Sequence, residues 1–263
     1  MPELPEIETV KLQLQKVLVG QKLLHSNFSE LNGKTVKEIK RLGKVLLINF
    51  GPNLDLGFHF KMTGQLIYDD GHKRIAGGHP SEDFVAKLPN SHTREIFEFE
   101  KGKLFFNDMR KFGWIEINPK FVDKLGPEPF DITAAEFIKR LSSSKRPIKI
   151  AIMDQEIISG VGNIYANDAL WESRIHPATP VSQLSVKQLN SLLEKIKLVL
   201  KEGIKYGGAT AENYVNLHGL GGHYQDHFRT YNREGLPCLR CKTKIKKIVL
   251  GGRGTYYCPA CQV

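Results

Sequence analysis

The sequence predicts a multi-domain α+β protein, in which a helix and an antiparallel β-sandwich precede a helical domain and a C-terminal four-cysteine ribbon. Three observations support this fold class. Short strand-like segments fill residues 34–119 with no helical segment between them, helical periodicity returns after residue 132, and all four cysteines lie within residues 238–261. A chain of 263 residues can also bury a substantial core, and its length favours two domains over one.

The first predicted element is an amphipathic helix near the N-terminus, which Gly20 ends. Apolar side chains recur there at helical spacing, at Ile7, Val10, Leu14, Val17 and Leu18. This apolar face would anchor the N-terminus against a core. The strand-like segments that follow alternate apolar and polar residues and are separated by Gly, Asn and Pro, which predicts an antiparallel sandwich. They are residues 45–50, 55–60, 64–68, 94–100, 104–107 and 114–118.

A change of pattern follows the last strand. The stretch Gly126-Pro127-Glu128-Pro129 is typical of a linker, and a long helix is predicted over 189–200, with Gly207-Gly208 as its end. Two capping boxes mark helix starts, Thr133 with Glu136 and Ser185 with Gln188. The predicted organisation is therefore a sandwich domain at 1–120, a linker at 121–132, a helical domain at 133–228 and a ribbon at 229–263.

The charge balance favours a polyanionic partner. Lysine and arginine together number 38 against 28 acidic residues, a net charge of +10. Charge alone does not choose between nucleic acid and another polyanion. No apolar run approaches the roughly 20 residues that span a bilayer, and the chain does not start with a signal-peptide pattern, so a soluble, cytosolic protein without a membrane partner is expected.

The cysteines have the spacing of a metal site. Cys238 and Cys241 form one C-x-x-C pair, Cys258 and Cys261 form another, and 16 residues separate the two pairs. This is the arrangement of a four-cysteine zinc ribbon. Two disulfides are the alternative, but a cytosolic chain lacks the oxidising environment that keeps them. One Zn²⁺ held by four thiolates leaves no open position for a substrate, so the predicted role is structural.

The chain opens with Met1-Pro2-Glu3, which combines a nucleophile with an acid. If Met1 is removed, Pro2 has a free secondary amine, whose pKa of about 8 leaves roughly a tenth of it neutral at neutral pH. Condensation with a sugar C1′ would give an iminium that cannot lose a proton from nitrogen and therefore acts as an electron sink. Glu3 is a candidate acid for opening the sugar ring, with Glu6 to orient it. The alternative is that these glutamates only favour a helix start.

Two glycine-flanked segments have the residue types that fill a gap in a base stack. Residues 59–64 contain Met62, an unbranched apolar side chain, and residues 108–113 contain Arg110 and Phe112, a fork of donors and an aromatic wedge. The alternative is that Met62 and Phe112 are core residues. Their glycine and lysine neighbours favour exposed loops.

Taken together, the Pro2-Glu3 start, these two loops, the stretch Gly160-Val161-Gly162-Asn163, the stretch Gly251-Gly252-Arg253-Gly254 and the cysteine pairs resemble the formamidopyrimidine-DNA glycosylase family. The resemblance runs from Met1 to Cys261. It implies a helix-two-turn-helix motif in the helical domain. It also implies that Lys44 and Arg253 join Pro2 and Glu3 in catalysis. The DNA contacts that it implies are His92, Arg110, Lys149, Met62, Phe112 and Asn163.

The activity that the resemblance implies is that of a bifunctional DNA glycosylase and AP lyase of base excision repair. Such an enzyme excises oxidised purines such as 8-oxoguanine and formamidopyrimidines from double-stranded DNA and then cleaves the strand by β,δ-elimination. A bacterial-type cytoplasmic monomer is expected. The Met62, Arg110 and Phe112 combination resembles the purine-lesion branch rather than the endonuclease VIII branch.

Two alternatives remain. One is an endonuclease VIII-like glycosylase for oxidised pyrimidines, and the other is a non-catalytic zinc-ribbon protein that binds nucleic acid. Some features depart from the family pattern and bear on lesion preference. Asp168 stands where the family pattern has a glutamate, and the segment between Gly20 and Lys34 is shorter than is usual in the family. Thr230-Tyr231-Asn232 replaces a Val-Tyr-Gly, and the loop 217–224, which would cover the base, has its own composition.

Overall fold

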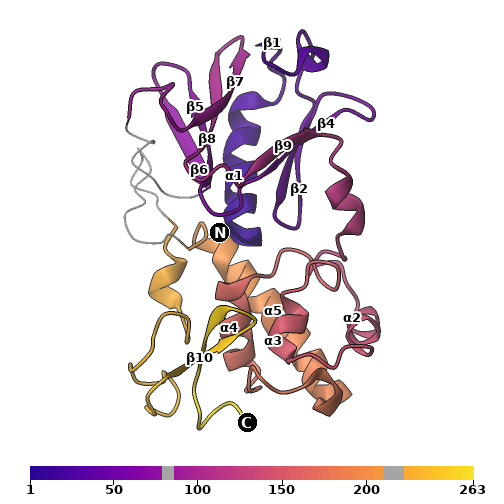
Figure 1. Cartoon of the computed structure of the whole chain (residues 1–263), viewed down its shortest axis with the longest axis vertical. Helices are drawn as coiled ribbons and strands as arrows, with labels where there is room; N and C mark the ends of the chain where they lie inside the picture. Colours follow the sequence, from indigo (N-terminus) through magenta and orange to yellow (C-terminus); the bar gives the residue numbers. More distant parts are fainter. Residues whose placement is uncertain (79–85, 210–221) are drawn as a thin grey trace. The chain divides into compact units, whose positions relative to one another are not determined.

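The computed structural model describes residues 1–78, 86–209 and 222–263. The chain forms two compact units, drawn in Figure 1. Unit 1 contains Met1–Val122 and Ile204–His223, and unit 2 contains Asp123–Gly203 and Tyr224–Val263. Both the helical region and the four-cysteine ribbon belong to unit 2. No helix in the described ranges is long and apolar enough to cross a membrane.

Unit 1 is an antiparallel β-sandwich, as predicted. One sheet has the strand order β1-β7-β8-β5-β6 and the other the order β2-β3-β4-β9. Apolar side chains from the two sheets meet in one core, which includes Leu46, Phe58, Leu66, Phe97 and Phe106. The strands are β1 (Leu23–His25), β2 (Glu38–Leu42), β3 (Val45–Asn49), β4 (Asp55–His59), β5 (Gly64–Asp69), β6 (Arg74–Gly78), β7 (Thr93–Phe99), β8 (Gly102–Asp108) and β9 (Trp114–Ile117).

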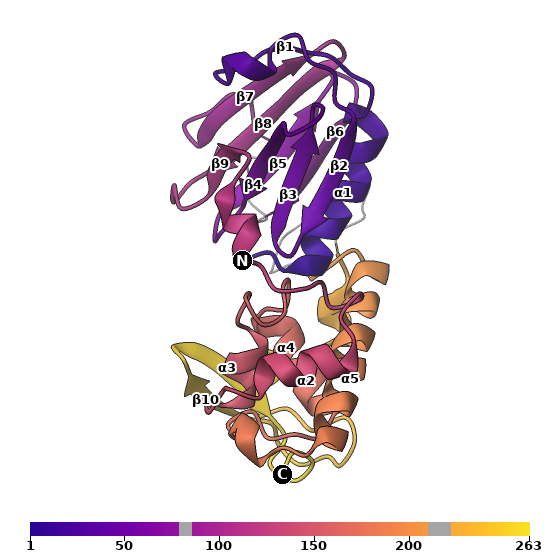
Figure 2. The same ribbon diagram turned by 90° about the vertical axis from the view of Figure 1, so that its right-hand side faces the viewer.

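The predicted N-terminal helix, α1 (Leu4–Leu18), closes one side of the sandwich. It packs against β6 and β2, the edge strands of the two sheets, and Figure 2 shows it beside β2. Its buried residues include Ile7, Val10, Leu14 and Leu18, the face that the periodicity predicts. Val10 lies so close to Gly77 of β6 that no side chain fits there, so the helix and the strand approach closely.

Unit 2 is built around helices. They are α2 (Ala134–Leu141), α3 (Ile148–Ile152), α4 (Asn163–Glu172) and α5 (Val186–Lys205), which continues into unit 1. Both predicted caps form: Thr133 Oγ1 accepts from the backbone N–H of Glu136 at 3.2 Å, and Ser185 Oγ accepts from that of Gln188 at 3.3 Å. After α5, Gly207 and Gly208 adopt positive φ angles of 74° and 85°, which end the helix.

The ribbon contains one hairpin, and several short 3-10 turns accompany the main elements. The hairpin pairs β10 (Lys246–Leu250) with β11 (Arg253–Tyr257), and Gly251 and Gly252 form its tip with positive φ. The 3-10 turns are η1 (Ser29–Leu31), η3 (Lys120–Lys124), η4 (Val181–Gln183) and η5 (Tyr224–His227).

Candidate active site and metal centre

The N-terminus lies at the first turn of α1. Pro2 is buried and Glu3, the N-cap of the helix, has a side chain only 2% exposed. Glu6 Oε2 accepts a hydrogen bond from the backbone N–H of Glu3 at 2.7 Å, as in a capping box. The helix start therefore fixes the backbone that carries the predicted nucleophile and acid.

Glu6 also binds the chain that leaves α5. Its second oxygen, Oε1, accepts from the backbone N–H of Ala209 at 2.7 Å. Gly208 packs against the Glu6 side chain at a φ of +85°, so a larger residue there would both strain the backbone and displace the carboxylate. Ala209 pairs with His223 in a β-bridge. Within unit 1, one carboxylate thus joins the predicted catalytic N-terminus to residues 208–209.

Lys44 lies in the turn between β2 and β3, next to Gly43 with a φ of +56°. The side chain is 6% exposed. Arg41 braces this turn, since its Nε donates to Glu8 Oε2 of α1 at 2.8 Å and its Nη1 donates to the Gly43 carbonyl at 3.0 Å. Glu8 is in the N-terminal half of α1, so the Lys44 turn and the Pro2 end of the helix lie on the same side of unit 1.

Burial alone would raise the pKa of Glu8, but the hydrogen bonds and positive charges of Lys11 and Arg41 outweigh it. They hold the pKa of this carboxyl below its ordinary value. Glu8 is therefore a charged brace between the helix and the turn that carries Lys44.

The two predicted wedge loops meet at one buried carboxylate, that of Asp108, which is 1% exposed. Asp108 Oδ1 accepts from the Thr63 hydroxyl of the first loop and from the Arg110 N–H at 3.2 Å. Its Oδ2 accepts from the Gly113 N–H at 2.7 Å, and Thr63 Oγ1 accepts from the Arg110 N–H at 3.0 Å. A single side chain therefore holds both loops in fixed register.

The wedge side chains themselves are exposed, as the flanking residues predict. Met62 is 38% and Phe112 is 54% exposed, and the Arg110 guanidinium carbon lies 4.8 Å from the centre of the Phe112 ring. Lys61 and Lys111 hold positive φ angles of 47° and 57° at the two turns. Met109, 52% exposed beside Arg110, is a further apolar side chain that the sequence analysis did not single out.

His59 supports the first loop from beneath. Its Nδ1 accepts from the Lys61 N–H at 3.1 Å, and its ring packs against Trp114 and Phe121. Burial, with the nearby charges of Lys61 and Lys44, lowers the pKa of His59 to about 3. The imidazole therefore stays neutral and keeps Nδ1 as an acceptor.

His92 lies beside Asp108, the residue that joins the two loops. Its carbonyl accepts from the Asp108 N–H at 2.9 Å, and the neighbouring Arg94 Nε donates to the Asp108 carbonyl at 2.8 Å. Unit 1 therefore brings together four of the predicted DNA-binding residues: Met62, His92, Arg110 and Phe112.

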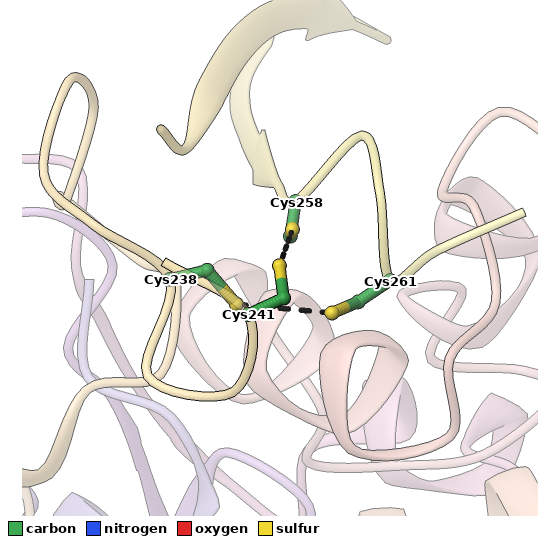
Figure 3. A group of neighbouring side chains, drawn as sticks. All are labelled: Cys238, Cys241, Cys258 and Cys261. Atoms are coloured by element: carbon green, nitrogen blue, oxygen red, sulfur yellow. Dashed lines mark hydrogen bonds between the residues drawn. The ribbon is translucent and has the colours of Figure 1, made fainter. Parts of the chain in front are cut away.

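The four cysteines form one cluster in unit 2 (Figure 3). All of their Sγ atoms lie within 4.8 Å of one another, with Cys238 and Cys261 at 3.9 Å and Cys241 and Cys258 at 3.4 Å. Tetrahedral Zn²⁺ with Zn–S bonds of about 2.3 Å places its sulfurs roughly 3.8 Å apart. The cysteines are free thiols rather than disulfides. The cluster therefore fits one closed, structural zinc ion.

The hairpin that carries Arg253 is held by two helices. Lys149 of α3 is fully buried, and its Nζ donates to the Gly254 carbonyl at 3.0 Å and to Thr255 Oγ1 at 2.7 Å. Asn167 of α4 accepts from the Tyr256 N–H at 2.7 Å. Arg253 itself is exposed. Lys149 thus acts on the hairpin in this structure, and its contact with DNA phosphate stays a prediction.

Asn163 begins α4 directly after Gly162, the N-cap residue, and is partly exposed. Asn167 Nδ2 donates to the Asn163 carbonyl at 2.6 Å. The first turn of α4 is therefore linked through Asn167 to the hairpin strand β11. The backbone N–H groups at a helix start, together with the helix dipole, suit a phosphate oxygen.

Asp168, one residue further along α4 than Asn167, is fully buried and binds the chain at 229–231. Its Oδ1 accepts from the N–H groups of Arg229, Thr230 and Tyr231 at 3.1, 3.0 and 3.3 Å, and its Oδ2 accepts from the Tyr224 hydroxyl at 3.2 Å. Burial raises the pKa of Asp168 against the effect of these donors. Most of the predicted base-covering loop, residues 217–221, lies outside the described residues.

Comparison with known proteins agrees with this geometry. Three domain models match the chain: the formamidopyrimidine-DNA glycosylase N-terminal domain at 1–115, the formamidopyrimidine-DNA glycosylase H2TH domain at 125–215, and the zinc finger found in FPG and IleRS at 235–263. The formamidopyrimidine-DNA glycosylase of Ligilactobacillus salivarius is 37% identical over 287 residues, a match that covers 100% of this chain and 99% of that protein.

Solved structures match equally well over the whole length. Structures of Lactococcus lactis Fpg with DNA that contains an abasic site, Fapy-dG or an oxidised pyrimidine are 32–33% identical, with TM-scores of 0.84–0.86 and coverage of 99% of each chain. MutM (Fpg) from Thermus thermophilus is 32% identical, with a TM-score of 0.86 and coverage of 99% of this chain and 98% of that one. The chain therefore belongs to the formamidopyrimidine-DNA glycosylase family of DNA-repair enzymes.

Proposed function

We propose that the protein is a bifunctional glycosylase and AP lyase that excises oxidised purines from duplex DNA and then cleaves the strand. The observation that carries this proposal is the placement of Pro2 and Glu3 at the start of α1, beside the braced Lys44 turn. A binding protein without chemistry has no use for a nucleophile and an acid in adjacent positions.

The proposed reaction starts once Met1 has been removed. Pro2 nitrogen forms a bond to C1′ and loses its N–H proton, and the bond from C1′ to the damaged base breaks, with a proton passing to the departing base. Glu3 gives a proton to the ring oxygen of the deoxyribose, and the bond from C1′ to that oxygen breaks, which opens the ring and leaves the iminium. The resulting iminium draws electrons from C2′ when its proton is removed, so the C3′–O bond breaks first and the C5′–O bond second. We assign Lys44 and Arg253 to assist these eliminations.

Base extrusion is assigned to the loops that Asp108 joins. Removal of a base from the stack costs a few kcal/mol, which side chains that fill the gap offset. Met62 and Phe112 supply exposed apolar groups, and Arg110 supplies donors for the partner base. A guanidinium only donates, so Arg110 suits cytosine, whose O2 and N3 accept.

We propose that the partner is double-stranded DNA and that the four cysteines bind one zinc ion. Net charge +10 favours phosphate, and His92, Lys149 and Asn163 are proposed to contact the backbone directly or through the hairpin. The zinc ion supplies folding energy to the ribbon when bound. We further propose that the protein acts in the cytoplasm as a monomer.

The second candidate function is excision of oxidised pyrimidines. The wild-type Lactococcus lactis relative was solved with DNA that contains an oxidised pyrimidine, and a mutant of it was solved with DNA that contains Fapy-dG. The experiment compares strand cleavage of duplexes that carry 8-oxoguanine opposite cytosine with duplexes that carry thymine glycol. Faster cleavage at 8-oxoguanine supports the proposal. Faster cleavage at thymine glycol would support the second candidate, and binding without cleavage of either would support a non-catalytic protein.

A further inference from the structure

One contact joins the cysteine cluster to the helix that begins at Asn163. Trp171, in the last turn of α4, donates its indole Nε1–H to Cys238 Sγ at 3.4 Å. Trp171 is 5% exposed and Cys238 is fully buried, so water does not compete for this bond. A donor aimed at a metal-bound thiolate stabilises its negative charge and fixes its direction.

A second contact comes back from the cluster to the same helix. Arg240 lies between Cys238 and Cys241 in the chain, and its guanidinium carbon is 3.6 Å from the centre of the Trp171 ring. It donates to the carbonyls of Trp171 at 2.5 Å and Glu172 at 3.3 Å, the last carbonyls of α4. Arginine at this end both satisfies unpaired carbonyls and complements the helix dipole.

Glu172 extends the network away from the metal site. Its Oε2 accepts from Arg240 at 2.7 Å, and its Oε1 accepts from Arg229 at 3.1 Å. The backbone N–H of Arg229 in turn binds Asp168. The end of α4 is therefore bonded on one side to the cysteine cluster and on the other to residues 229–231.

We propose that Trp171 and Arg240 are positioning residues for the zinc ion, and that zinc in turn holds the C-terminal cap of α4. Without the metal, nothing holds the four Sγ atoms together, so the indole loses the fixed position of its acceptor, and the Cys238–Cys241 segment that aims Arg240 at α4 is released. The proposal rests on zinc binding by the four cysteines and not on the glycosylase reaction. It predicts that metal retention depends on two residues that are not ligands.

The first test measures zinc release from the full-length protein into a colorimetric chelator. Trp171→Phe keeps a buried ring and removes the N–H donor, and Arg240→Gln removes the charge and the stacked fork. Loss of such an outer partner costs about 10–100-fold in metal affinity, so release should be on the order of 10-fold faster in each variant. Leu239→Ala, at an exposed position in the same Cys238–Cys241 segment, is the control and should release zinc at the parent's rate.

The second test asks whether zinc holds the end of α4. The chain has two tryptophans, so Trp114→Phe leaves Trp171 as the single tryptophan reporter. Removal of zinc from this variant should change the Trp171 emission, and added zinc should restore it. Parent-like release rates in both Trp171→Phe and Arg240→Gln would overturn the proposal, as would Trp171 emission that does not respond to zinc. Cleavage assays on the zinc-loaded variants test the proposed function separately.

Discussion

At the scale of single residues, Asp108 is the buried carboxylate that joins the two predicted wedge loops. Its two oxygens accept from Thr63 in one loop and from Arg110 and Gly113 in the other. An extrusion step needs its filling side chains at fixed positions relative to each other. We infer that Asp108 sets the relative placement of Met62 and Phe112.

Replacement of Asp108 by alanine should lower the free energy of unfolding by about 1–3 kcal/mol, because the Thr63 hydroxyl of one loop and the backbone N–H groups of Arg110 and Gly113 in the other lose their acceptor. Urea unfolding of the full-length protein measures the change. Asp131→Ala, at an exposed position, is the control and should stay within about 0.5 kcal/mol of the parent. A loss for Asp108→Ala no larger than that of the control would show that the loops keep their register without it.

Residue types singled out the candidate chemistry-bearing side chains, and Glu6 as a residue to orient Glu3, but they did not reveal the support that Asp108 and Trp171 provide or the bond from Ala209 to Glu6. A terminal proline amine, a methionine in a glycine-flanked loop and two C-x-x-C pairs each have a chemistry that local sequence reveals. Asp108, Glu6 and Trp171 act through partners far along the chain, for example Glu6 with Ala209 and Trp171 with Cys238. Such pairings depend on the folded arrangement, and the spacing of residues in the chain does not contain them.

At the scale of elements, the periodicity of apolar residues located the regular helices and strands. The α1 and α5 helices and six strands lie where alternation and capping predicted them. Strands β1, β2 and β6 were not anticipated. β1 is three residues long, and β6 ends in Ala76-Gly77-Gly78, residues of low strand preference. The close approach of Val10 requires the glycine at 77. The β6 strand therefore forms because α1 packs against it, and the local sequence of β6 does not predict it.

The brace between α1 and the Lys44 turn should make stability depend on pH. Because the folded pKa of Glu8 lies below its ordinary value of 4.5, the folded state holds this proton less tightly than the unfolded state. Its stabilising contribution is therefore present above the unfolded pKa and is lost as pH falls through the folded pKa. Glu8→Gln should remove this dependence.

Urea unfolding at several pH values, from about 3 to 7, measures the effect. The difference in unfolding free energy between the parent and Glu8→Gln should be greatest at the neutral end and should shrink toward the acidic end. Arg41→Gln, which removes the partner instead, should weaken the same dependence. A difference that is constant over the whole range would contradict the charged brace.

The hairpin also permits a prediction at this scale. Lys149→Met keeps the buried volume but removes the bonds from Nζ to Gly254 and Thr255, so Arg253 should lose its fixed position. Cleavage should fall in Lys149→Met while the salt dependence of DNA binding stays that of the parent. Arg253→Gln, as the comparison, should reduce the slope of log K against log salt by about 1, the value for one phosphate contact.

The two roles of Lys149 give opposite results in that experiment. A slope reduced by about 1 in Lys149→Met would identify a direct phosphate contact, as the family resemblance implies. An unchanged slope with lower cleavage would identify a positioning role through the hairpin.

At the scale of the whole molecule, DNA is the partner that the net positive charge and the family membership of the two units indicate. The excess of positive charge favours binding that does not depend on the DNA sequence, and we propose that specificity comes from the two loops that Asp108 joins and from a site for the extruded base. The sequence anticipated the fold class because alternation marks the sandwich, helical periodicity marks the helices and the cysteine spacing marks the ribbon, whereas it placed residues 204–209 in the helical domain although they belong to unit 1. We expect lesion preference to depend on Asp168 and on the loop 217–224, where the sequence departs from the family pattern.

The central claim is that the amine of Pro2 attacks the sugar, and borohydride trapping tests it most directly. The duplex carries 8-oxoguanine opposite cytosine, and mass spectrometry of the digested adduct identifies the modified peptide. We expect a covalent adduct on the N-terminal peptide of protein that has lost Met1, and none with a version that retains Met1, in which the Pro2 nitrogen is an amide. An adduct on a lysine, or equal trapping by the version that retains Met1, would contradict the claim.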